Sequence, residues 1–200
     1  MVRPLTLLQM QGAPDNPAPL ADAALVLIDI QEEYRDGALP LDGATDAALA
    51  AGELLQLGRE SRIPIFHIRH RLPDDSPIFS PRLPSFAFMP EVAPWPDEPV
   101  FEKSVPNAFS GTALHEAIRK TGRRELIFAG MQTHLCISAT VRAALDLGYR
   151  STVVGSACAT RDLPDAADGV IAAKDVHRTA LAELADAFAI IVPDRSAWRQ

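Results

Sequence analysis

The chain has 200 residues, of which 48% are hydrophobic, which is enough for one buried core but too few for two domains. The formal net charge of −7 argues against nucleic acid as a partner, because nucleic-acid binders gather basic residues on one face. The longest apolar runs fall well short of the ~20 residues needed to cross a bilayer, so we expect no membrane segment.

The amino-terminal residues and the number of cysteines indicate the cellular compartment in which the protein is expected. Residues 1–10 are mildly apolar, but Pro4 interrupts them and no small-residue cleavage site follows, so a secretory signal is not expected. Two cysteines do not indicate a disulfide scaffold. The sequence therefore predicts a cytoplasmic protein.

Residues 1–22 hold four prolines and little periodicity, which predicts an arm ahead of a single domain over residues 23–200. Within that domain, short apolar runs typical of buried strands alternate with helical patterns. The expected strands cover residues 24–30, 63–69, 99–102, 126–129, 151–155 and 187–192, and the expected helices cover residues 44–62, 111–121, 134–147 and 172–186. This alternation predicts an α/β fold with a mostly parallel sheet covered by helices on both faces.

The stretch from Pro73 to Pro106 breaks this rhythm, since it holds nine of the 17 prolines. It also carries Phe79, Phe86, Phe88 and Trp95. A connection of this length is either an ordered surface excursion or a functional loop. Because its aromatic side chains need burial, we expect it to shape a pocket or a subunit contact, and we predict a homo-oligomer of at least two copies.

Cys136 is the strongest candidate for chemistry. The segment ELIFAGMQTHLC, residues 125–136, runs from a buried strand through Gly130 to a cysteine at the start of a predicted helix. Unpaired N–H groups and the helix dipole at such a position favour a thiolate, and the same N–H groups can hold an oxyanion. Cys158 instead fits the usual buried, inert cysteine.

Asp29 stands at the end of the first predicted strand, and Lys103 follows the predicted strand over residues 99–102. An acid at the carboxyl end of a parallel strand faces the crevice in which doubly wound folds bind ligands, although a simple turn or cap aspartate is the alternative. A lysine is most often a solvated surface cation. Beside a thiol and a carboxylate, however, its charge would lower the pKa of the thiol and make the buried acid tolerable.

Other sites find less support in the sequence. His67 and His70 lie three apart on a predicted strand and point to opposite faces, so we expect no metal site. No glycine-rich nucleotide motif is present, and Ser156 lacks the Gly-x-Ser-x-Gly elbow of serine hydrolases. We therefore expect no cofactor. His134 is a possible base partner for Cys136, but residues two apart at a helix start seldom align in that way.

The chain resembles the isochorismatase-like cysteine hydrolases in the set Asp29, Lys103 and Cys136 and in three segments. These segments are FEKSVPNAFSGT at 101–112, GMQTHLC at 130–136 and ACATRD at 157–162. The resemblance covers about residues 22–193. It implies six parallel strands in the order 3-2-1-4-5-6, which brings the first and fourth strands side by side. It also implies a cis peptide between Met131 and Gln132, which would aim the N–H groups of Gln132 and Cys136 into an oxyanion hole.

The resemblance implies a hydrolase that cleaves an amide-type C–N bond of a small non-peptide molecule through a thioester. Nicotinamidases of this family have an Asp-x-His metal pattern that HIRHRLP at 67–73 lacks, and true isochorismatases lack the cysteine. The alternatives are isochorismatase-type chemistry, a redox-responsive thiol protein and an idle binding module. The candidates for lining the substrate pocket are Gln31, Tyr34, Trp95, Phe109, His134 and Arg161, of which Arg161 could pair with a substrate carboxylate.

Overall fold

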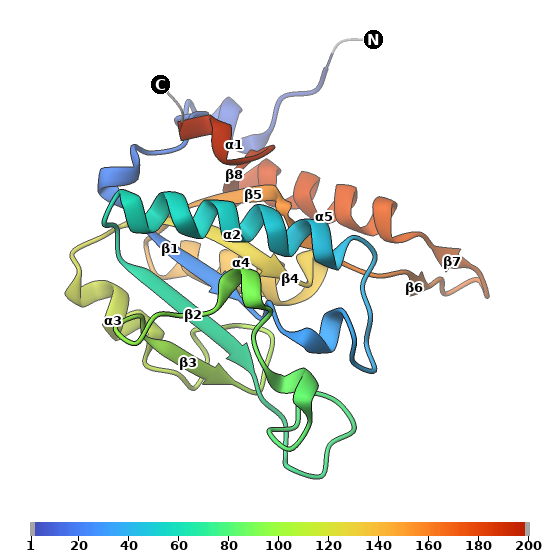
Figure 1. The fold of residues 1–200 in the computed structure, drawn as a ribbon. Helices are drawn as coiled ribbons and strands as arrows, with labels where there is room; N and C mark the ends of the chain where they lie inside the picture. Colours follow the sequence, from blue (N-terminus) through green and yellow to red (C-terminus); the bar gives the residue numbers. More distant parts are fainter. Residues whose placement is uncertain (1–2, 199–200) are drawn as a thin grey trace.

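The computed structural model describes residues 3–198 and has a six-stranded parallel sheet at its centre (Figure 1). The strands lie in the order β3-β2-β1-β4-β5-β8, so the predicted topology is confirmed. Their bounds are β1 Ala23–Ile28, β2 Ile65–His70, β3 Val100–Lys103, β4 Glu125–Met131, β5 Arg150–Ala159 and β8 Ala189–Val192. Since β1 and β4 are neighbours, the order of the strands reverses between them, and a crevice is expected at their carboxyl ends.

Helices cover both faces of the sheet. Their bounds are α1 Leu7–Met10, α2 Ala44–Glu60, α3 Leu114–Lys120, α4 Ser138–Asp146 and α5 Ala173–Ala187. Helix α2 packs on one face, and α3, α4 and α5 pack on the other. None of the helices within residues 3–198 is long and apolar enough to cross a membrane.

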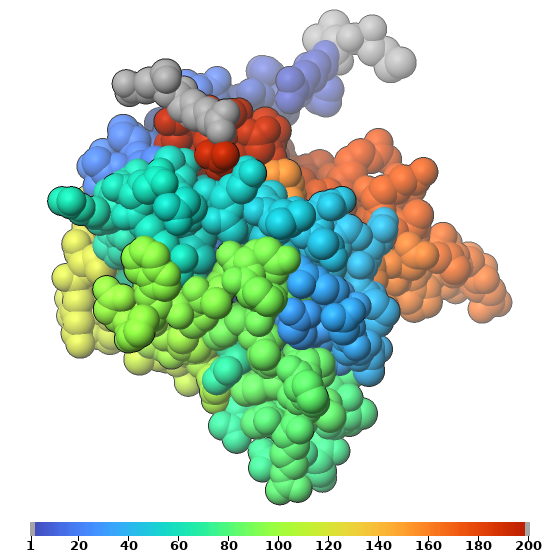
Figure 2. All heavy atoms as spheres, viewed as in Figure 1, coloured from blue at the N-terminus to red at the C-terminus, as the bar shows by residue number. Residues whose placement is uncertain are grey.

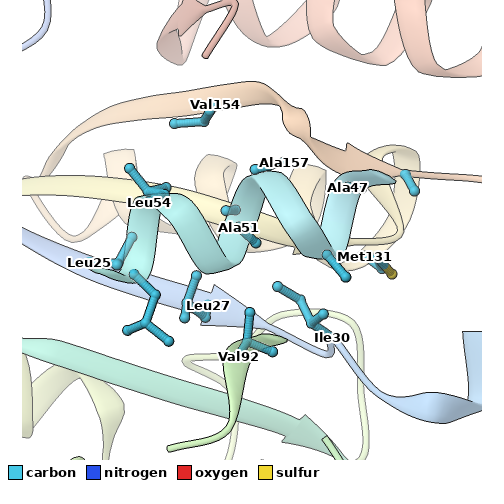
Figure 3. Close-up of a cluster of buried hydrophobic side chains, with 14 of the residues drawn as sticks. Leu25, Leu27, Ile30, Ala47, Ala51, Leu54, Val92, Met131, Val154 and Ala157 are labelled. Carbon is cyan, nitrogen blue, oxygen red and sulfur yellow. The ribbon is translucent and has the colours of Figure 1, made fainter. Parts of the chain in front are cut away.

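The alternation of side chains along β1 divides the core into two layers. Leu25 and Leu27 point toward α2, whose small residues Ala47 and Ala51 let the helix approach the sheet closely (Figure 3). The intervening Val26 points to the opposite layer. Both faces of β1 are therefore apolar, which is why the strand reads as a continuous hydrophobic run.

Several elements differ from the sequence prediction. The helix expected over residues 134–147 begins with a π-helical turn, Thr133–Ile137, before α4. The helix expected from residue 111 starts only at Leu114. A small antiparallel hairpin, β6 Leu163–Pro164 with β7 Val170–Ile171, was not predicted and projects from the body of the molecule (Figure 1). Two-residue strands are too short to leave a periodic signal.

The amino-terminal arm carries the short helix α1, which Thr6 caps. The backbone N–H of Leu7 donates a hydrogen bond to Asp186 of α5, 3.0 Å away. The described part of the arm therefore lies against the domain.

The Pro73–Pro106 excursion folds onto its own chain and projects beyond the carboxyl end of β2 (Figures 1 and 2). It contains two 3₁₀ turns, Pro84–Phe86 and Pro90–Val92, and the strand β3. Phe79 and Phe86 are buried within the chain, whereas Trp95 remains 53% exposed. Most of the aromatic burial is thus achieved without a second subunit, and association of copies stays a prediction.

Candidate active site

Four side chains from four neighbouring strands converge at the carboxyl edge of the sheet. Asp29 follows β1, His70 ends β2 and Lys103 ends β3. Cys136 lies in the π-helical turn after β4. The side chains of Asp29, Lys103 and Cys136 are almost fully buried, and His70 is partly buried. The structure thus brings together the three residues singled out in the sequence and adds a histidine that the sequence analysis passed over.

The ammonium group of Lys103 is the centre of this cluster. Its Nζ lies 2.5 Å from Oδ2 of Asp29, 2.9 Å from Nδ1 of His70 and 3.3 Å from Sγ of Cys136. An ammonium has three N–H donors and no acceptor, so the three neighbours match its hydrogen-bonding capacity. Lys103 therefore holds the carboxylate, the imidazole and the thiol around one positive charge.

The backbone at Asp29 helps to aim its carboxylate. Asp29 adopts a left-handed conformation with φ of 53°, which is uncommon for a residue other than glycine. The peptide between Met131 and Gln132, at the end of β4, is cis. The left-handed conformation of Asp29 thus lies at the end of one of the two strands that flank the crevice, and such conformations gather at functional sites.

The protonation state of Cys136 corrects one expectation. Burial, together with the negative charge of Asp29, raises the pKa of the Cys136 thiol to about 12, and the charge of Lys103 offsets this only in part. The predicted low pKa is therefore wrong, because burial and the charge of Asp29 outweigh the charge of Lys103. Burial also raises the pKa of Asp29, against the opposing charge of Lys103. The resting thiol is therefore neutral, and the carboxyl group of Asp29 that lies beside it is paired with the ammonium of Lys103.

His70 is a neutral imidazole at this site. Burial and the charge of Lys103 lower its pKa to about 4. His67, three residues earlier, points elsewhere, and its Nε2 lies 2.9 Å from Glu98. The two histidines point in different directions, as the strand pattern predicts. His70 is the last residue of β2, and this position at the carboxyl edge of the sheet is the signal that could have marked it as a site residue.

The convergence of Asp29, His70 and Cys136 also raises the question of a metal. Within residues 3–198, these three side chains place ligand atoms within 4.8 Å of one another. The ammonium of Lys103 contacts all three, so a metal ion would meet a positive charge in the same place. These residues fit a lysine-centred cluster and do not fit a bound metal ion.

Tyr34 and Gln132 lie beside the cluster. The Tyr34 side chain is buried, and the charges of Asp29 and Cys136 add to burial in raising the pKa of its hydroxyl. The buried side chain of Gln132 lies close enough to this hydroxyl to oppose that rise in pKa in part. Of the predicted pocket residues, Tyr34 is therefore next to the reactive groups.

The amide of Gln31 is already committed to the backbone. Its Nε2 donates to the carbonyls of His70 and Phe86, and its Oε1 accepts from the N–H of His70 at 2.8 Å. Gln31 thus ties the end of β2 to the excursion, and its contact with substrate stays a prediction.

His134 and Arg161 form a separate group at the end of β5. Nδ1 of His134 lies 2.6 Å from Oγ1 of Thr160, so this nitrogen is not directed at Cys136 as a base. The charge of Arg161 adds to burial in lowering the pKa of His134, which places the guanidinium nearby.

Trp95 and Phe109 lie away from the cluster. Trp95 packs over Arg59, 4.1 Å from the guanidinium carbon, close to Pro99 at the amino-terminal end of β3. Phe109 stacks on Tyr149, which precedes β5. Trp95 thus lies at the amino-terminal edge of the sheet, and Phe109 contacts a residue just before the start of β5.

The excursion contributes one side chain that sequence reasoning missed. The ring of Phe79 meets His70 edge-on at 4.9 Å and Tyr34 at 5.3 Å. Its backbone N–H donates to the buried carboxylate of Glu33, which also accepts from Ser85 and Ala38. The excursion is thereby fixed with Phe79 against two residues of the site.

A model of the isochorismatase domain matches residues 23–194 of the chain. The chain belongs to the isochorismatase family. It is 33% identical over 186 residues to the secreted isochorismatase effector Isc1 of Verticillium dahliae, covering 93% of this chain and 95% of that protein. It superposes with a TM-score of 0.90 on the crystal structure of an isochorismatase from Pseudomonas putida KT2440, at 41% identity, covering 96% and 97% of the two chains.

A further family member, a streptothricin hydrolase of Streptomyces noursei, is 30% identical over 147 residues. The match covers 72% of this chain and 52% of that enzyme. The family relationship makes the chain an isochorismatase-family hydrolase. The buried cluster lies at the carboxyl ends of the strands around β1 and β4, where the strand order reverses.

Proposed function

We propose that the protein is a cysteine-dependent amidohydrolase that cleaves a C–N bond of a small non-peptide molecule. One observation carries this proposal: a single buried ammonium, that of Lys103, contacts both the thiol of Cys136 and the carboxylate of Asp29. A thiol, an adjacent base and a fixed cation are the parts that covalent acyl transfer needs. The named hydrolase among the relatives supports the reaction class.

In the first step, the Asp29 carboxylate takes the proton of the Cys136 thiol, and the thiolate attacks the substrate carbonyl. The site contains one anion and one cation before and after this transfer, since Lys103 stays protonated between the two groups. Proton transfer within a buried pair of constant charge avoids creating an uncompensated charge in a dry site. This offsets the high pKa of the isolated thiol.

The N–H groups of Gln132 and Cys136 are the proposed donors to the tetrahedral oxyanion. Asp29 then returns its proton to the leaving amine as the C–N bond breaks, which leaves a thioester on Cys136. Asp29 next takes a proton from water, and the hydroxide attacks the thioester carbonyl. The C–S bond breaks, the acid product leaves, and Asp29 returns its proton to the Cys136 thiolate. Asp29 thus acts in turn as base and acid.

The test is a panel of amides, lactams and carbamoyl compounds assayed for release of ammonia or amine. Cys136→Ala should abolish every activity found, whereas Cys158→Ala removes the other buried thiol and should leave activity within a fewfold of the parent. Activity that survives Cys136→Ala would reject a covalent cysteine mechanism.

A further inference from the structure

The contact with Lys103 fixes the proton on the His70 ring. Nδ1 of His70 lies 2.9 Å from the ammonium nitrogen, which can only donate. Nδ1 must therefore be the acceptor. A neutral imidazole that accepts at Nδ1 carries its hydrogen at Nε2, so the other edge of the ring is a donor.

The ring is also held against rotation. Gln31 binds both the N–H and the carbonyl of His70, which fixes the backbone at the end of β2. The edge-on contact with Phe79, at an interplanar angle of 64°, fixes the ring plane. A flip that exchanged the two nitrogens would give up the contact with Lys103. The direction of the Nε2–H group is thus set before any substrate binds.

Nε2 is the open position of the cluster. Among residues 3–198 no acceptor lies within hydrogen-bond distance of it, and it is not one of the fully enclosed polar atoms. The atoms of Asp29 and Lys103 beside it have no exposed side-chain surface. A molecule that approaches Cys136 therefore meets a fixed, unpaired donor on His70 next to the thiol.

We propose that His70 is a substrate-binding residue whose Nε2–H donates a hydrogen bond to an acceptor on the substrate. The substrate class that fits is an amide with a second acceptor, such as a carbonyl, carboxylate or ring nitrogen, close to the scissile carbonyl. A donor at that position on the substrate would face the N–H of His70 and be disfavoured. This inference rests on the proposed function only in taking Cys136 as the reacting group.

His70→Asn separates the two nitrogens of the ring. The Asn Oδ1 can replace Nδ1 as the acceptor for Lys103, while the shorter side chain supplies no donor at the position of Nε2. Two alkylating reagents report on that donor: iodoacetamide has a carbonyl beside its reactive carbon, and allyl iodide has no acceptor. With both, an S–C bond to Cys136 forms, iodide leaves, and the thiol proton passes to Asp29.

The rate constant for labelling of Cys136 is measured with each reagent and divided by the rate constant of that reagent with glutathione. The ratio of the two corrected values is the preference for iodoacetamide over allyl iodide. One net hydrogen bond corresponds to a preference of about 3- to 10-fold. His70→Asn should lose this preference, which is a ratio of two rates at the same thiol and so does not depend on a change in the reactivity of the thiol itself. His115→Asn, a change at a histidine that instead contacts Tyr149, should keep it. A preference unchanged in His70→Asn would overturn the proposal.

A measurement on the unmodified protein covers the case in which the variant does not fold. With ¹⁵N-histidine, the five histidines can be resolved by nitrogen NMR. The His70 signals should show a neutral ring with the hydrogen on Nε2 at pH 7. A charged ring, or a hydrogen on Nδ1, would overturn the proposal. Neither measurement needs turnover of a substrate. If both give the expected results but the protein hydrolyses no amide in the panel, the proposed function is rejected and the proposed role of His70 is retained.

Discussion

Gly130→Ala should test how closely the site depends on the contact between β1 and β4. Gly130 lies opposite Ile28 in the parallel ladder, one residue before Asp29. A Cβ at residue 130 would lie 2.0 Å from the carbonyl oxygen of Ile28, whereas ordinary contact begins at 3.4 Å. The two central strands would have to separate by about 1.4 Å, and the backbone φ of 141° would itself be strained for alanine.

A separation of that size breaks ladder hydrogen bonds, which need about 2.7–3.2 Å between donor and acceptor. Lost bonds at ~1 kcal/mol each and a backbone strain of ~1–3 kcal/mol give a loss on the order of 4 kcal/mol in the free energy of unfolding. Displacing Asp29 from Cys136 by about 1 Å should cost a further ~10²-fold in kcat/KM.

Urea denaturation followed by circular dichroism measures the loss of stability. Gly155→Ala on the neighbouring strand β5 is the control, because its Cβ would meet Leu181 at 3.3 Å and Val192 at 3.5 Å, which small adjustments accommodate. We expect that variant to stay within about 1 kcal/mol of the parent. Equal stability of the two variants would show that the close approach of β1 and β4 does not constrain residue 130.

Three further predictions concern charge and protons. Asp29→Asn should slow two reactions of Cys136, because both need Asp29 to take the thiol proton: labelling by iodoacetamide, and amide hydrolysis, which should fall by ~10²- to 10⁴-fold. An iodoacetamide rate that stays at the parent value in this variant would contradict the assignment of Asp29 as the base. Activity should survive exhaustive treatment with EDTA and 1,10-phenanthroline, and a loss that zinc reverses would show that a metal is needed. Hydrogen bonds from Arg59, Trp95 and His67 outweigh burial and lower the pKa of Glu98 to about 2, so its stabilising effect should be present above the ordinary glutamate pKa and be lost as pH falls toward 2. Glu98→Gln should therefore lower the free energy of unfolding by about 1–2 kcal/mol at pH 6 and by less at pH 3. The control Glu60→Gln, on the exposed face of α2, should change the free energy of unfolding little at either pH. A loss for Glu98→Gln that does not depend on pH would contradict the assigned charge.

The sheet could be predicted from the sequence because its strands are buried on both faces. Ala23–Ile28 reads as a continuous apolar run for this reason, and the helical patterns between such runs require parallel pairing. The positions of Asp29 and Lys103 followed from the same reasoning, since the carboxyl ends of parallel strands share one edge. These inferences depend on the local hydrophobic pattern and on the order of strands and helices along the chain, both of which can be read from the sequence.

Other features depend on contacts between distant residues. The high pKa of the Cys136 thiol arises from burial and from the charge of Asp29, neither of which is visible in the segment around the cysteine. His70 became part of the site only through its contact with Lys103, which lies on the neighbouring strand. The amide of Gln31 is likewise taken up by Phe86, 55 residues away. A lone polar residue beside a strand does not reveal such partners.

The thioester on Cys136 is the central claim, and trapping it is the most direct test. The enzyme is mixed with the amide that it hydrolyses fastest in the panel, quenched in acid within the first turnovers, and analysed by mass spectrometry of the intact protein and its peptides. We predict an added mass equal to the acyl group on the peptide with Cys136, removed by hydroxylamine, present in Cys158→Ala and absent in Cys136→Ala. Continued turnover by Cys136→Ala, with no acyl adduct in the parent enzyme, would contradict the account.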